Sequence, residues 1–298
     1  MLKNLAELIK EAQSKESRKM TVAAAHDEPV LVAVNNAMKE GLIIPILVGI
    51  EDEIRKMAAK INFDLSNVQI INEEDEIQAC KTSIKLIRDG EADILMKGLV
   101  STSKLLKPVL DKEKGLRKGA VLSHIAFADI PSYHKILAIT DAGMNPSPDF
   151  NQKVEIVKNA VEAFHRLGVK NPKVAVVAAV ETVNPKMECT VHAAMLTMMN
   201  KRKQINGCVI EGPFGFDNAI NKEACEHKGI ETEVGGDADI ILCPDIQAGN
   251  ILYKSINFLA GATTGAVIMG AKVPIVLTSR ADTDKSKFMS IAYAAAMD

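Results

Sequence analysis

The pattern of apolar and polar positions predicts short buried strands that alternate with amphipathic helices. Apolar runs such as 43–49 have the length of a buried strand, whereas segments such as 149–167 place apolar residues three and four positions apart between charged ones. The predicted strands are 19–25, 43–49, 68–72, 92–96, 119–127, 134–140, 173–180, 207–211, 238–243 and 274–278. The most regular helices are predicted at 27–41, 74–89, 149–167, 184–203, 217–228, 249–260 and 284–297.

This alternation predicts an α/β protein with mainly parallel sheets, because a helix that connects two parallel strands has to cross one face of the sheet. Ten strands are more than one twisted sheet usually holds. The fold class expected is therefore two α/β/α domains with a cleft between them. A domain boundary is predicted near Pro131, close to the proline-rich loop at 145–148.

Composition and charge limit the partners of the chain. It has 298 residues, of which 47% are hydrophobic and 25% charged, enough for two ordinary cores. Its net charge of −2 gives no general attraction to nucleic acid or to a membrane surface, so neither is an expected partner. The cysteines form no CxxC pair, which favours reduced thiols in a cytoplasmic protein; they are Cys80, Cys189, Cys208, Cys225 and Cys243.

Neither the N-terminal segment nor the longest uncharged stretch is predicted to enter a membrane. Lys3 and Glu7 interrupt the N-terminal segment, which favours an amphipathic helix over a signal peptide. The uncharged stretch between Lys254 and Lys272 contains Asn257, three glycines and two threonines. We predict the end of a helix, a glycine-rich turn and the start of a strand there.

Asp245, Gly249 and Asn250 form the strongest local signature of a ligand site. Asp245 follows a predicted strand, and Asn250 lies at the start of the next helix. Their side chains can hydrogen-bond opposite sides of a cleft, and Gly249 allows close backbone approach. The alternative is that all three are turn and capping residues only.

Ser279 and Arg280 stand at the end of the last predicted strand. Backbone N–H groups converge on anions at such strand ends, and the guanidinium of Arg280 offers a planar set of donors that suits phosphate. Packing explains an arginine beside a hydroxyl poorly at this position. The pair is therefore a candidate anion site.

Lys97 places a positive charge at the end of an earlier predicted strand. A Lys-Gly turn then leads to Ser101, Thr102 and Ser103, each a candidate N-cap of the following helix. Lys97, Ser101 and Thr102 are candidate ligands of a phosphate group, because a helix N-terminus favours an anion. An ordinary capped helix with solvated lysines is the alternative.

The methionine-rich segment 184–203 has the spacing of a helix that packs in a core rather than that of a cofactor site. Cys189 and His192 lie three residues apart on it, but no second pair of ligands accompanies them, so no metal site is predicted. The methionines expected in the core are Met187, Met195, Met198 and Met199.

The motifs GGDADIILCPDIQAGN at 235–250 and GAVIMGAKVPIVLTSRADTDKSK at 265–287 together resemble the phosphate acyltransferase family, and its phosphate butyryltransferase branch most closely. The resemblance implies two domains of the isocitrate and isopropylmalate dehydrogenase architecture, with the C-terminal segment returning to the first. The domains expected are 1–130 plus 270–298, and 131–269.

The resemblance also implies the chemistry. A short-chain acyl group, butyryl in preference, would pass reversibly between coenzyme A and inorganic phosphate, giving acyl phosphate and coenzyme A. Ser279 and Arg280 would stabilise the phosphate, with Lys97 adding positive charge. No cofactor or metal is implied, because coenzyme A is a substrate. A homodimer or larger homo-oligomer in the cytoplasm is expected.

One departure from the family concerns the general base. The acetyl-specific branch carries a carboxylate six residues after the arginine of its Ser-Arg pair, where this chain has Ser286. Asp282 and Asp284 are the nearby acids, and Asp284 stands closer to the family position. Asp284 is therefore the predicted base for the coenzyme A thiol, and the alternative is that it only caps the final helix.

Other functions remain open at this point. The closest alternative is a phosphate acetyltransferase. A non-catalytic protein that binds acyl-CoA or phosphate would keep the cleft but lose turnover. A metal-dependent NAD dehydrogenase of the same architecture would need an Asp cluster or a GxGxxG turn, and neither is evident. A transferase acting on acyl carrier protein would need a basic docking face, which a nearly neutral chain does not indicate.

Overall fold

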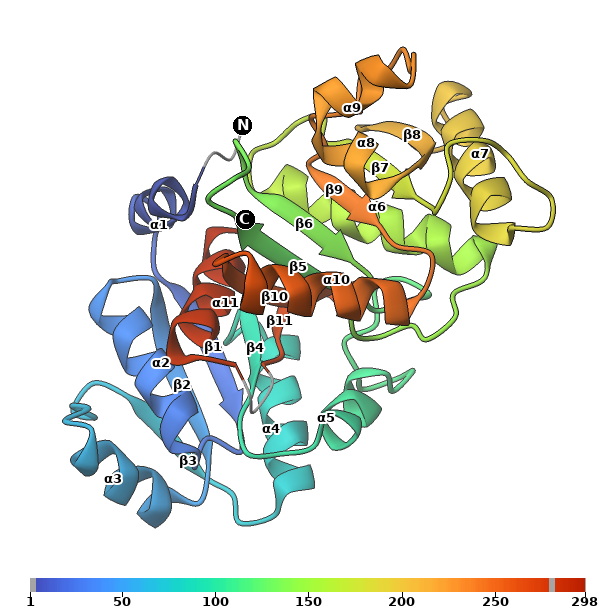
Figure 1. The fold of residues 1–298 in the computed structure, drawn as a ribbon. Helices are drawn as coiled ribbons and strands as arrows, with labels where there is room; N and C mark the ends of the chain where they lie inside the picture. Colours follow the sequence, from blue (N-terminus) through green and yellow to red (C-terminus); the bar gives the residue numbers. More distant parts are fainter. Residues whose placement is uncertain (1–3, 279–281, 298) are drawn as a thin grey trace. The chain divides into compact units, whose positions relative to one another are not determined.

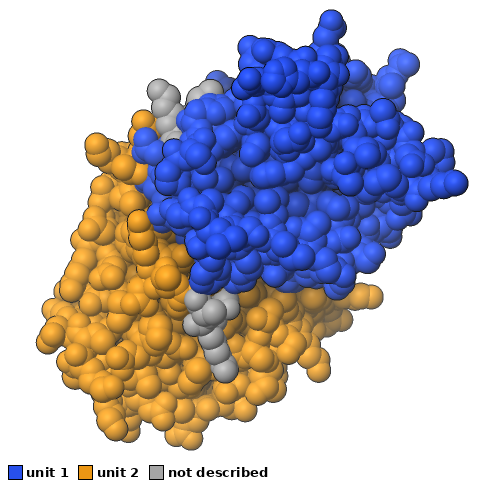
Figure 2. Space-filling view, viewed as in Figure 1, with its two compact units in different colours: residues 1–5, 121–264 blue, residues 6–120, 265–298 orange. Residues whose placement is uncertain are grey.

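Short strands and amphipathic helices alternate along the chain, as predicted, in the computed structural model, which describes residues 4–278 and 282–297 (Figure 1). The fold divides into two units, which Figure 2 shows in different colours. Unit 1 comprises Met1–Leu5 and Val121–Thr264, and unit 2 comprises Ala6–Ala120 and Gly265–Asp298. Unit 2 is therefore built from two segments that are far apart in the sequence.

The strands of unit 2 lie in the order β3-β2-β1-β4-β11-β10. Neighbouring strands are parallel except for β10, which runs antiparallel to β11. Met20 of β1 pairs with Pro45 of β2 on one side and with Ile94 of β4 on the other. These strands are β1 (Arg18–Ala23), β2 (Ile43–Gly49), β3 (Gln69–Asn72), β4 (Ile94–Lys97), β10 (Thr263–Met269) and β11 (Ile275–Val276).

Helices cover both faces of this sheet. α2 and α3 connect β1 to β2 and β2 to β3, whereas α4 returns from β3 to β4, so right-handed crossovers place α4 on the opposite face. The direction of the connections reverses between β1 and β4, which makes their carboxyl ends a topological switch point. The helices are α1 (Leu5–Gln13), α2 (Glu28–Lys39), α3 (Glu51–Lys60), α4 (Glu76–Arg88), α5 (Thr102–Val109) and α11 (Asp284–Ala296).

Unit 1 contains five described strands in the order β5-β6-β9-β7-β8. β5 runs antiparallel to β6, and the other neighbours are parallel. The strands are β5 (Ser123–Asp129), β6 (Leu137–Thr140), β7 (Lys173–Val177), β8 (Val209–Phe214) and β9 (Ile240–Leu242). The helices are α6 (Phe150–Arg166), α7 (Glu188–Lys201), α8 (Phe216–Ile220), α9 (Lys222–His227) and α10 (Ile246–Leu259).

The α/β class with mainly parallel strands is confirmed, and the differences from the predicted elements have local causes. α3 is missing from the prediction because only Ile54 and Ala58 of its ten residues are buried, too few for a periodic pattern. β10 is anticipated only as the start of a strand. The predicted helix 217–228 is two short helices, α8 and α9.

The prediction that methionines pack in the core is wrong for two residues of α7, while Met187 and Met199 are half-buried. Met195 and Met198 are 43% and 53% exposed, while Ala193 and Leu196 are buried. The helix has apolar residues on nearly all sides, so the methionine spacing does not indicate which side faces inward.

An ion-pair network around the buried Lys135 joins the amino ends of β6, β7 and β9 in unit 1. Lys135 is only 2% exposed, and its Nζ lies 2.9 Å from Oδ1 of Asp237 and 2.8 Å from Oδ1 of Asp239. Lys173 and His134 also contact Asp237, each at 2.8 Å. Burial alone would raise the pKa of Asp237, but hydrogen bonds from Lys173, His134 and Lys135 outweigh it and lower that pKa.

Candidate active site

A pocket of about 480 Å³ opens in unit 2 at the carboxyl ends of β1 and β4. Residues 26–30, at the start of α2, and residues 97–99, after β4, form much of its wall. Thr278, which follows β11, and Lys287 of α11 complete it with Met57. The pocket therefore lies at the topological switch point, where α/β sheets characteristically bind ligands.

The loops that follow β1 and β4 pack backbone against backbone beside this pocket. The N–H of Leu99 donates to the carbonyl oxygen of Ala24 at 2.7 Å, and the N–H of Gly98 donates to that of Ala23 at 2.8 Å. A Cβ at Gly98 would lie 2.1 Å from the Ala24 oxygen, so only glycine fits. Ala24 has a φ of 54°, a left-handed conformation that non-glycine residues seldom adopt.

Lys97 is the predicted ligand residue that lines this pocket. Its Nζ donates to the carbonyl oxygens of Gly98 at 3.1 Å and Val100 at 3.2 Å. These contacts hold the ammonium group near the loop between β4 and α5, where an anion would profit from its charge.

The predicted cap at the start of α5 is confirmed for Ser101, whose Oγ accepts the N–H of Lys104 at 3.3 Å. Thr102 is the first helical residue, and both side chains are exposed. Lys104 pairs with Glu76 at 2.7 Å. Glu76 thus compensates the charge of Lys104, whereas Lys97 lines the pocket.

Ser279 and Arg280 lie outside the described residues. They follow Thr278 directly in the sequence, and Thr278 is 5% exposed and lines the pocket.

Thr283, not Asp284, is the N-cap of α11. Oγ1 of Thr283 accepts the N–H of Ser286 at 3.1 Å. Asp284 is the exposed first residue of the helix, so the alternative that it only caps α11 is wrong. Ser286, at the family's carboxylate position, is 7% exposed and its hydroxyl lies 3.1 Å from that of Thr283.

Two residues of the pocket, His26 and Lys287, were missed from the sequence. Both are buried, with exposures of 6% and 5%. His26 comes directly after the predicted strand 19–25 and before Asp27, which caps α2 by accepting the N–H of Val30 at 3.3 Å. A polar residue between a buried strand and a helix cap was the signal that could have identified it.

Asp245 and Asn250 belong to unit 1, at the carboxyl edge of its parallel strands. Asp245 caps α10 by accepting the N–H of Ala248 at 2.9 Å. Asn250 donates from Nδ2 to the carbonyl oxygen of Ala142 at 3.0 Å. The predicted close approach at Gly249 is confirmed, because a Cβ there would lie 2.3 Å from the carbonyl oxygen of Asp141. Both polar side chains thus have contacts within unit 1.

Burial makes several cysteines poor nucleophiles. It raises the pKa of Cys243, after β9, to about 12, and that of Cys80 and Cys208 to about 11 each. A thiolate at these positions is strongly disfavoured near neutral pH, so none of the three is suited to form a covalent acyl intermediate.

In residues 4–278 and 282–297, no three His, Cys, Asp or Glu side chains gather in an arrangement that could hold a metal ion. The same part of the chain contains no helix with the length and apolar character needed to cross a membrane.

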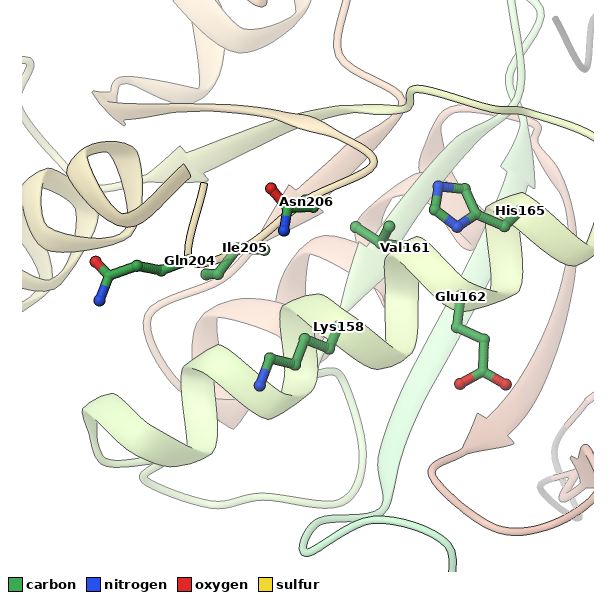
Figure 3. Close-up of a pocket in the computed structure, with 7 residues that line it drawn as sticks. All are labelled: Lys158, Val161, Glu162, His165, Gln204, Ile205 and Asn206. Atoms are coloured by element: carbon green, nitrogen blue, oxygen red, sulfur yellow. The ribbon is translucent and has the colours of Figure 1, made fainter. Parts of the chain in front are cut away.

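A smaller hollow of about 210 Å³ in unit 1 lies between α6 and the loop before β8 (Figure 3). Lys158, Glu162 and His165 line it from the helix, and Gln204 and Asn206 from the loop. The hollow is at the amino end of β8, the edge opposite to that at which α/β sheets bind ligands. The unit 2 pocket is therefore the stronger candidate.

The chain is similar to known proteins over nearly its whole length. The family model described as phosphate acetyl/butaryl transferase matches residues 4–83 and 78–295. The chain is 45% identical over 295 residues to the phosphate butyryltransferase of Clostridium acetobutylicum, covering 99% of this chain and 98% of that protein. It is 44% identical over 291 residues to the phosphate acetyltransferase of Thermotoga maritima, covering 98% of each.

A solved structure agrees with these sequences. The branched-chain phosphotransacylase of Enterococcus faecalis V583 superimposes with a TM-score of 0.82 at 33% identity, covering 94% of this chain and 98% of that one. The match therefore extends to the fold as well as to the sequence. This chain belongs to the phosphate acetyl/butaryl transferase family.

Proposed function

We propose that this protein is a phosphate acyltransferase that moves a short-chain acyl group, butyryl in preference, reversibly between coenzyme A and inorganic phosphate. The observation that carries the proposal is 45% identity to a phosphate butyryltransferase over 99% of the chain. The pocket at the switch point of unit 2 supports it, because Lys97 and Lys287 bring positive charge to a site of the kind that binds anions.

The reaction assigns a task to each candidate residue. When acyl phosphate reacts with coenzyme A, the thiol, of pKa about 8.5, loses its proton, sulfur attacks the carbonyl carbon, and the bond from carbon to the phosphate oxygen breaks. Asp284 accepts the proton in this proposal. Ser279 and Arg280 stabilise the negative charge that develops on the phosphate, with Lys97 adding positive charge.

The remaining candidates bind substrate. Ser101 and Thr102 direct their hydroxyls and the N–H groups of the α5 start to a phosphate group. Asp245 and Asn250 are the candidates in unit 1 for contact with the coenzyme A or acyl part. Transfer is direct, without a covalent enzyme intermediate, and coenzyme A is a substrate rather than a cofactor.

The proposed function is tested by phosphate-dependent release of coenzyme A from acetyl-, butyryl- and isobutyryl-CoA. The highest kcat/KM is expected with butyryl-CoA. A clear preference for acetyl-CoA would instead identify a phosphate acetyltransferase. Binding of coenzyme A without turnover of any of the three would identify a non-catalytic protein.

We also propose a cytoplasmic homodimer or larger homo-oligomer. Four of the five cysteines are buried and all are free thiols, as expected in a reducing compartment. Ile251, Phe258 and Leu259 of α10 are 66%, 64% and 85% exposed, and their spacing places them on one face of that helix, which favours a partner surface. Light scattering on the purified protein measures the oligomeric state directly.

Replacing Arg280 with alanine is expected to raise the KM for phosphate about 30-fold and to lower kcat, because a bidentate, charge-assisted contact to the anion is lost. Arg280→Lys should restore only part, since an ammonium group cannot reproduce the planar set of donors. Steady-state kinetics with phosphate varied check this result. Unchanged kinetics in the alanine variant, with an unchanged Tm, would remove Arg280 from the site.

Activity is expected to survive prolonged chelation, because the proposed transfer needs only protein side chains and a carboxylate base. Turnover measured after dialysis against a strong chelator checks this, with addition of Mg²⁺ or Mn²⁺ as the comparison. Loss of turnover that a divalent ion restores would contradict the metal-free reaction.

A further inference from the structure

The imidazole of His26 is held in the unit 2 pocket with one of its nitrogens still available. The N–H of Ile50 donates to Nδ1 of His26 at 3.4 Å. Because Nδ1 accepts, the neutral ring carries its proton on Nε2, on the opposite edge. Within the described chain, Nε2 has no hydrogen-bond partner, although His26 is only 6% exposed and lines the pocket.

The backbone is shaped to let this ring approach. A Cβ at Gly49, the last residue of β2, would lie 2.8 Å from Nδ1 of His26 and 3.0 Å from the backbone nitrogen of Ala25. Glycine at position 49 therefore lets the imidazole lie against the end of β2. With Nδ1 occupied by the Ile50 N–H, Nε2 is the edge of this nearly buried ring that can donate to a ligand group in the pocket.

Lys287 brings charge to the same pocket. It is 5% exposed, and its Nζ donates to the backbone carbonyl of Asp282. The ion pairs found among the described residues do not include Lys287, so this part of the chain gives its ammonium group a backbone carbonyl rather than a carboxylate. An anionic ligand supplies a counterion.

The pocket also contains two carboxylates, and both are engaged elsewhere. Asp27 caps α2 through the N–H of Val30. Glu28 pairs with Lys60 at 2.9 Å. Among the described residues neither carboxylate is hydrogen-bonded to Nε2 of His26, and the pairing with Lys60 offsets the charge of Glu28. The balance of the pocket therefore favours an anion that accepts hydrogen bonds.

We propose that His26 donates a hydrogen bond from Nε2 to a phosphate group of a substrate, with Lys287 and Lys97 supplying positive charge around it. The inference rests on the proposed function for the identity of that substrate and adds a binding residue to it. Two sources offer the same chemistry, namely inorganic or acyl phosphate and the phosphate groups of coenzyme A.

The test uses two substitutions that separate the edges of the ring. His26→Asn keeps an oxygen that accepts the Ile50 N–H but has no donor where Nε2 lies, whereas His26→Gln reaches that position with its amide N–H. Calorimetric Kd values are measured for inorganic phosphate, coenzyme A and dephospho-coenzyme A. His26→Asn is expected to weaken binding of the phosphate-bearing ligand roughly 10-fold or more, and His26→Gln about 3-fold.

The three ligands distinguish the sources. A weaker Kd for inorganic phosphate alone assigns His26 to the transferred phosphate. A weaker Kd for coenzyme A, with the difference between coenzyme A and dephospho-coenzyme A lost, assigns it to the 3′-phosphate. Weakening of both coenzyme A forms alike assigns it to the pyrophosphate.

His227→Asn on α9 is the matched control, because that side chain is 75% exposed, and its Kd values are expected to match the wild type. Wild-type Kd values in His26→Asn, whether or not its Tm falls, would overturn the inference, as would absence of phosphate and coenzyme A binding in the wild type. Turnover is measured separately. If the wild type binds phosphate but shows no acyl transfer, and His26→Asn weakens that binding, the proposed function is refuted and the inference about His26 stands.

Discussion

Replacing Lys135 with methionine is expected to lower the free energy of unfolding by about 3–5 kcal/mol. Lys135 is 2% exposed and contacts Asp237 and Asp239, and Asp239 is itself only 8% exposed. Methionine fills a similar volume but leaves the buried Asp239 without the Lys135 ammonium group and removes one of the cations that contact Asp237. The cost is therefore electrostatic, and chemical denaturation followed by circular dichroism measures it.

Two further variants separate this cause from a general effect of lysine removal. Lys158→Met removes an exposed pair with Glu155 at 2.8 Å, which is worth only about 0–1 kcal/mol. Adding Asp239→Asn to Lys135→Met should recover part of the loss, because the amide needs no cation while its oxygen still accepts the N–H of Lys173, as Oδ2 does now at 2.8 Å. A loss no larger than in Lys158→Met would contradict the electrostatic account.

The stability of the protein at acidic pH should depend on the same ion pairs. The folded-state pKa of Asp237 is lowered, so its contribution to stability is fully present above the unfolded pKa of about 3.9 and is lost as pH falls through the lower folded value. Wild-type stability should therefore fall below about pH 4. The fall should be shallower in Lys135→Met, because one of the groups that lower this pKa is gone.

The strands and long helices were predictable because they are encoded in local periodicity. β2 begins and ends where the apolar run 43–49 predicts, and α6 fills 150–166 of the predicted 149–167. The class of the fold follows from their alternation. α7 was harder, because a helix that is apolar nearly all round has no periodicity to show which methionines lie outside.

The candidate site was only partly predictable, because it depends on which strand ends meet. Lys97 was identifiable as a cation at a strand end. His26 was not, since its role depends on β1 lying beside β4, and strand order is not visible in the local pattern. The N-cap residue of α11 could not be identified from the sequence, because Thr283 and Asp284 are adjacent and both residue types cap helices.

Replacing Asp284 with asparagine is expected to lower kcat roughly 100-fold, the usual scale for loss of a general base, with little change in the Kd for coenzyme A. The structure strengthens this prediction by removing the rival role. Thr283 caps α11, so Asp284→Asn should leave the Tm nearly unchanged. Lys287, three residues later on the same helix, lines the pocket, whereas Asp284 is exposed and is not among the lining residues.

The other acids are less suited to the task. The carboxylate of Asp141 accepts the backbone N–H groups of His124, Gly143 and Met144, and Asp245 caps α10. Both carboxylates therefore already serve structural hydrogen bonds in unit 1.

Single-turnover and steady-state kinetics on three variants decide the matter. Asp282→Asn should keep most of the wild-type kcat. Thr283→Ala should lower stability by about 1 kcal/mol through loss of the cap, yet still turn over, which isolates the structural effect of this helix start from its chemistry. Normal turnover in Asp284→Asn would exclude Asp284 as the base. A fall of equal size in all three variants would mean that the helix start acts on catalysis through its position alone, because only a base at Asp284 makes the effect specific to that carboxylate.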